Sequence, residues 1–260
     1  MDKQDGIFDR VLKRIGLSIA NYLSQPVSQY THFSLEDTDS LKSHLLPGDI
    51  LLVEGRQRIS TAIKYLTQST WSHAAIYIGD ITDSKTGVTL HHQLIEADLV
   101  DGVVAVQVDK YCDVNTRICR PIGLNENDQR TVVEYMLNSL GKTYDQRNIV
   151  DLIRYLFPTP PIPSNYRREL LKLGSGDPTR AICSTLIAQA YQSIQYPILP
   201  LVKQRGDYKK LLFQLRHHSL FVPRDFDISP FFNIIKPALF THFDRRKIQW
   251  DMKENPVKPS

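Results

Sequence analysis

Hydrophobic positions follow two spacings along the chain, and together they predict a core built from short strands and helices. Apolar runs that are rich in β-branched residues and bounded by turn residues are typical of strands. They occupy residues 50–53, 72–79, 88–97, 103–108 and 116–120. Apolar residues spaced three and four apart predict helices. These occupy residues 59–66, 125–140, 146–157, 166–173 and 182–194. The first strand follows a Pro-Gly-Asp turn, so we expect the core to begin at Leu46.

Three stretches depart from this pattern. Residues 7–23 have one apolar and one basic face at helical spacing, which predicts an amphipathic helix docked on the core, with a membrane-surface helix as the alternative. A polar connection is expected to follow this helix. Residues 158–180 hold clustered prolines and glycines and are predicted to form an insertion. We therefore expect an N-terminal helix and connection (1–45), a central domain (46–230) and a basic aromatic extension (231–260).

Charge and hydropathy narrow the possible partners and locations. The net charge of +4 is too small to indicate nucleic acid. Residues 201–260 carry 12 Lys and Arg against 6 Asp and Glu, together with several aromatic residues. We expect these aromatics to pack on the core, with contact to anionic lipid as the alternative. Without an apolar signal segment or a membrane-spanning stretch, the chain is predicted to be cytoplasmic; peripheral membrane association and signal-independent export are the alternatives.

Cysteine and histidine spacing argues against a metal or disulfide framework. Cys112, Cys119 and Cys183 form no CxxC pair, as expected for a protein of a reducing compartment. The chain has two His-His dipeptides, at 91–92 and 217–218, and neither has further candidate metal ligands nearby. Because Walker and GxGxxG sequences are also missing, we expect neither a metal nor a cofactor.

A histidine and a carboxylate are predicted to meet on the hairpin formed by residues 72–79 and 88–97. If the hairpin is symmetric about residues 83 and 84, His73 and Glu96 face each other within about one pairing step. A carboxylate at that distance orients the imidazole ring and raises its basicity. Asp98 is the alternative orienting residue if the register slips by two.

Cys183 lies in the first turn of the helix predicted at 182–194. The positive end of the helix dipole and the free N–H groups there favour a thiolate, and they can stabilise a developing oxyanion. Cys183, His73 and Glu96 together have the parts needed for acyl transfer. A small buried cysteine is the alternative that spacing alone leaves open.

Besides these three residues, six segments of the sequence resemble segments of a known protein family. They are GDILL (48–52), WSHAAIYIGD (71–80), LIEA (94–97), GKTYD (141–145), ICSTLIAQAY (182–191) and FVPRDFDISP (221–230). In this order they resemble the YiiX/YebB-like, circularly permuted papain-like family, of the NlpC-type amidase group and related to lecithin:retinol acyltransferase. The resemblance implies an α+β fold with an antiparallel sheet packed against helices. It also implies that Cys183 is the nucleophile, His73 the base and Glu96 the third catalytic residue, with Tyr144 contacting the substrate.

The resulting hypothesis is a cysteine-dependent hydrolase or acyltransferase that cleaves an amide or ester bond. Peptide, amide and acyl-lipid substrates remain open, with a peptidyl amide favoured by the NlpC kinship. The alternative is a binding module of the same fold that has lost turnover and recognises a small amine or lipid in the same groove.

Overall fold

The computed structural model describes residues 22, 25, 38–82, 87–98, 100–143, 182–204, 211–214 and 216–236. Three predicted helices lie wholly or almost wholly outside these residues, at 7–23, 146–157 and 166–173. The insertion at 158–180 and most of the C-terminal extension also lie outside them.

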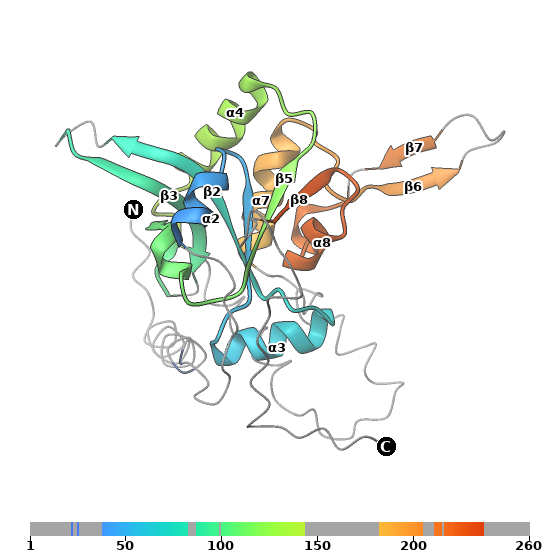
Figure 1. Cartoon of the computed structure of the whole chain (residues 1–260). Coiled ribbons are helices and arrows are strands. Elements are labelled where there is room, and N and C mark those ends of the chain that lie inside the picture. The colour runs from blue at the N-terminus through green and yellow to red at the C-terminus, as the bar shows by residue number, and fades with distance from the viewer. Residues whose placement is uncertain are drawn as a thin grey trace, which may run out of the picture.

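A six-stranded antiparallel sheet forms the centre of the fold, in the order β4-β3-β2-β1-β5-β8 (Figure 1). Its strands are β1 (Ile50–Val53), β2 (His73–Thr82), β3 (Thr89–Asp98), β4 (Gly102–Gln107), β5 (Thr116–Pro121) and β8 (Phe232–Ile235). The sheet and the helices around it confirm the predicted α+β class. Strand β8 pairs with β5 and lies beyond residue 230, so the sheet reaches into the segment predicted as an extension.

Helices cover both faces of the sheet. On one face, α4 (Glu126–Leu137), α7 (Ile182–Ser193) and α8 (Pro223–Asp227) pack on side chains such as Ile50, Ile76 and Ile95. On the other face, α2 (Thr38–His44) and the 3-10 helix η1 (Val108–Tyr111) cover Leu51 and Leu94. Because both faces are covered, every residue of β1 is buried, which explains its continuous apolar run.

The remaining elements lie outside these two layers. Helix α3 (Arg58–Thr67) follows β1, and a second sheet consists of β6 (Leu201–Gln204) and β7 (Leu211–Gln214) (Figure 1). A 3-10 helix, η2 (His218–Leu220), precedes α8. The prediction of a plain polar connection before Leu46 was wrong where α2 forms, because Leu41 is buried against the sheet.

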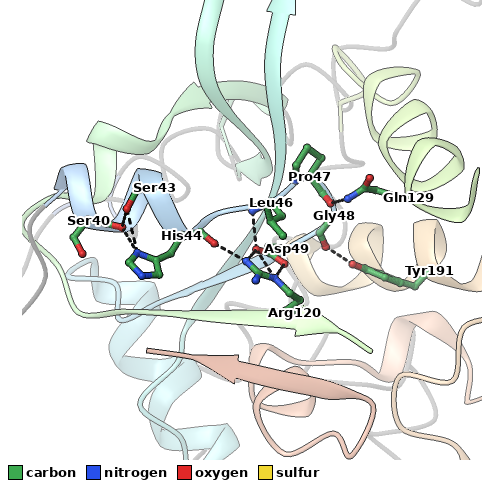
Figure 2. A network of polar contacts seen from close by, with 10 residues as sticks. All are labelled: Ser40, Ser43, His44, Leu46, Pro47, Gly48, Asp49, Arg120, Gln129 and Tyr191. Atoms are coloured by element: carbon green, nitrogen blue, oxygen red, sulfur yellow. Dashed lines mark hydrogen bonds and ion pairs between the residues drawn. The ribbon is translucent and has the colours of Figure 1, made fainter. Parts of the chain in front are cut away.

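A buried ion pair fixes the start of β1 (Figure 2). Asp49 is 1% exposed, and its carboxylate accepts hydrogen bonds from Leu46 N–H at 2.8 Å and from Arg120 Nε at 2.9 Å. Tyr191 of α7 donates its hydroxyl to the carbonyl of Gly48. Burial raises the pKa of Asp49, against the opposing effect of Arg120. These contacts tie the turn before β1 to β5 and α7.

Replacing Arg120 with leucine is expected to destabilise the chain strongly. The change removes the counter-charge and leaves the buried Asp49 carboxylate uncompensated, a loss of about 3–5 kcal/mol in the free energy of unfolding. Urea denaturation of wild type and Arg120→Leu measures it. The double variant Asp49→Leu/Arg120→Leu, which buries no charge, should recover part of the loss; equal stability of all three chains would contradict a role for this pair.

Candidate active site

His73 and Glu96 meet on the face of the sheet that η1 covers. His73 is the first residue of β2, and its Nε2 lies 3.1 Å from Glu96 Oε2 on β3. The predicted contact is present, but the predicted register was wrong. Ala75 pairs with Glu96 and Ile81 with Leu90, so the hairpin is symmetric about residues 85 and 86, with a register irregularity around Gly79. His73 and Glu96 are therefore diagonal neighbours, a distance that long side chains can bridge.

Three donors hold the Glu96 carboxylate, whose side chain is 1% exposed. Besides His73, they are the ammonium group of Lys110, which bonds Oε1, and the hydroxyl of Tyr111, which bonds Oε2. The sequence pattern did not identify Lys110 or Tyr111, which both belong to η1. Their only signal was their position directly after β4, the strand that pairs with β3.

Asp98, the alternative orienting residue, has another function in the structure. Its Oδ1 accepts the backbone N–H groups of Val100 and Asp101 in the turn between β3 and β4. The carboxylate that contacts the His73 ring is that of Glu96.

Cys183 reaches His73 from the N-terminal turn of α7. It is the second residue of the helix and 5% exposed, and it forms a side-chain hydrogen bond with His73. The backbone N–H of Ala74 also donates to its sulfur, and Ser184 Oγ lies 4.0 Å away. Since Nε2 of His73 bonds Glu96, Nδ1 is the ring nitrogen left for the thiol. The structure therefore brings Cys183, His73 and Glu96 into one chain of contacts.

The charges of the three groups reinforce one another. Burial opposes ionisation of Cys183, but the positive charge and hydrogen bond of His73 outweigh it and lower the pKa of the thiol. For His73, burial is likewise outweighed by the Cys183 thiolate and the Glu96 carboxylate, which raise its pKa to about 10. For Glu96, burial is outweighed by His73 and Lys110, which lower its pKa to about 2. These pKa shifts favour a thiolate on Cys183 and an imidazolium on His73, next to the Glu96 carboxylate.

A cavity of about 240 Å³ opens onto these groups. Cys183, His73 and Glu96 line it together with the start of α3 and the η1 residues Lys110 and Tyr111. An acyl group placed in the cavity would therefore contact both the Cys183 thiol and the His73 ring.

The other candidate cysteines and histidines that the structure describes do not line this cavity. Tyr144 lies outside the described residues. Cys119 is fully buried, and burial raises the pKa of its thiol. His91 pairs with Asp80 at 2.7 Å, and His92 contacts the hydroxyl of Tyr77 at 3.0 Å. Within the described parts of the chain, no group of three or more His, Cys, Asp or Glu residues could hold a metal ion, and no helix is long and apolar enough to cross a membrane.

A family model matches part of the chain. Residues 44–155 match the model of a family described as permuted papain-like amidase enzymes, the YaeF/YiiX or C92 family. This match confirms the resemblance to the YiiX-like permuted papain-like family. The chain is therefore similar to a family of hydrolases of the amidase type. The matched segment contains His73 and Glu96 and ends before Cys183.

A solved structure is also similar to this chain. It is described as the metalloprotein yiiX from Escherichia coli O157:H7 and is 16% identical, with a TM-score of 0.43. The alignment covers 74% of this chain and 97% of that one. No curated protein matches the chain.

Proposed function

We propose that this protein is a cysteine-dependent hydrolase that cleaves an amide or ester bond through an acyl-enzyme on Cys183. The observation that carries the proposal is the contact chain from Cys183 through His73 to Glu96, facing one cavity. The match to a family of amidases favours an amide over an ester, and a peptidyl amide is the substrate we favour.

The geometry supports a two-step reaction. The thiolate of Cys183 attacks the substrate carbonyl, and N–H groups at the start of α7 stabilise the oxyanion that forms. The His73 imidazolium then donates its proton to the leaving nitrogen as the C–N bond breaks, which leaves a thioester on Cys183. Neutral His73 next takes a proton from water, whose oxygen attacks the thioester and releases the acid. Transfer to another acceptor in place of water would make the same site an acyltransferase.

Iodoacetamide alkylation at different pH values tests the proposed nucleophile. At about pH 6 an ordinary thiol with a pKa of about 8.5 is less than about 1% thiolate. Because the pKa of Cys183 is lowered, we expect it to be alkylated at that pH at least about tenfold faster than Cys112, followed by mass spectrometry of the two peptides.

The variant His73→Ala is the control for this measurement. It removes the imidazolium that stabilises the thiolate, so the fast reaction at low pH should disappear while Cys112 is unaffected. Equal slow labelling of Cys183 and Cys112 in the wild type would overturn the hydrolase proposal and favour a binding module of the same fold.

A further inference from the structure

Helix α3 begins in the active-site cavity without a side-chain cap. Its N-cap residue, Gln57, makes no side-chain hydrogen bond to the first turn. The first turn of a helix presents backbone N–H groups that have no partner within the helix, together with the positive end of the helix dipole. Gln57, Ile59 and Ser60 all line the cavity that holds Cys183. This end of α3 therefore presents partial positive charge to the reacting groups.

A buried hydroxyl group lies at the same place. Ser60 is 4% exposed and lines the cavity, and among the described residues its Oγ has no hydrogen-bond partner. A Cβ added to Gly55 would clash with Ser60 Oγ, so the hydroxyl lies directly over another residue of the cavity lining. A hydroxyl that faces a cavity without a protein partner can donate a hydrogen bond to a bound group. The Ser60 hydroxyl is thus available to a ligand.

The charged side chains around the cavity are unevenly distributed. Arg56, which is exposed, lies on the side where α3 begins. The strand β3 contributes two carboxylates to the lining, those of Glu96 and Asp98, and η1 contributes Lys110, which pairs with Glu96. A cavity with this distribution directs an anionic group away from β3 and towards α3.

We propose that the α3 wall, defined as Gly55, Arg56, Gln57, Ile59 and Ser60, binds a carboxylate of the substrate next to the bond that Cys183 attacks. This inference rests on the proposed function and names its substrate class: acyl donors that carry a carboxylate. Ser60 Oγ and the backbone N–H groups of Ile59 and Ser60 donate hydrogen bonds to the carboxylate, while the N–H of Arg58 bonds the carbonyl of Gln25. Arg56 supplies the opposite charge.

Two matched alkylating reagents test the proposal without a known substrate. N-(iodoacetyl)glycine carries a carboxylate, and N-(iodoacetyl)glycinamide carries a neutral carboxamide of the same size. With each, the Cys183 thiolate displaces iodide and forms a C–S bond. The measured quantity is the rate with the carboxylate reagent divided by the rate with the carboxamide reagent. We expect this rate ratio at Cys183 to exceed the same ratio for free N-acetylcysteine by a factor on the order of ten, since hydrogen bonds to a charged group are strong.

Substitutions in the α3 wall test whether these residues, and not the His73 imidazolium, cause the faster reaction with the carboxylate reagent. Arg56→Gln and Ser60→Ala should each lower the rate ratio several-fold. The matched controls are Arg58→Gln and Thr61→Ala, whose side chains do not line the cavity; Arg58 instead lies 4.1 Å from the centre of the Tyr22 ring. Both controls should keep the wild-type ratio.

The outcomes distinguish this inference from the proposed function. Rapid labelling of Cys183 by both reagents, with the same ratio in wild type and all four variants, would refute the carboxylate site and leave the hydrolase intact. Slow labelling by both reagents would instead count against the hydrolase, while the ratio would still show whether the α3 wall binds a carboxylate.

Discussion

Replacing Cys183 with alanine is expected to abolish hydrolysis of p-nitrophenyl acetate by this protein. In the wild type, the thiolate should release about one p-nitrophenolate per chain in a rapid burst as the acyl-enzyme forms, followed by slower turnover. Alanine offers no nucleophile, so the burst should vanish and kcat/KM should fall by at least about 10³-fold, because nucleophile and base act as a unit. Stopped-flow absorbance measures both the burst and the turnover.

Cys112→Ala is the matched control for this result. It also removes one thiol, but from a residue that does not line the cavity, and it should keep both burst and turnover. Retention of the burst in Cys183→Ala together with its loss in Cys112→Ala would place the nucleophile elsewhere and contradict the proposed mechanism.

The strands and the contact between His73 and Glu96 were predictable because they depend on local patterns. β-branched runs between turn residues identified every strand from β1 to β5. The side-chain period of two placed His73 and Glu96 on the same face of the sheet even though the register was wrong by four residues. A slip by an even number of residues keeps each side chain on its face. Glu96 therefore lies two positions from the residue opposite His73 in both registers, and the contact survives the error.

The parts of the site that depend on folding at long range were not predictable in this way. Cys183 was nominated by its place at a helix start, but nothing in its spacing shows that this helix reaches β2, and the family resemblance supplied the connection. Lys110 and Tyr111 belong to a short 3-10 helix with no periodic signal, and only the pairing of β4 with β3 brings them to Glu96. The start of α3 joins the cavity for a similar reason, since a pattern that predicts a helix does not say what its first turn faces.

Replacing Glu96 with glutamine is expected to lower kcat/KM for p-nitrophenyl acetate by about 10²-fold or more, because a carboxylate that orients a catalytic histidine fixes its tautomer and stabilises its charge. The change keeps the size of the side chain but removes the charge that helps raise the pKa of His73 to about 10. In the proposed mechanism activity requires the Cys183 thiolate and the His73 imidazolium, so we expect it to rise with pH through the pKa of Cys183 and to fall through that of His73.

Without the Glu96 carboxylate the imidazolium is less stable, and the falling limb of the pH profile should move to lower pH. The rising limb should move to higher pH, because a less stable imidazolium supports the thiolate less, and the active pH range should therefore narrow from both sides. Asp98→Asn is the control: it alters the neighbouring carboxylate of β3, which bonds the turn and not the imidazole ring, and both limbs should stay in place. A narrowed profile in Asp98→Asn with an unchanged one in Glu96→Gln would make Asp98 the orienting residue and would show that the contact between His73 and Glu96 is not the one used in the reaction.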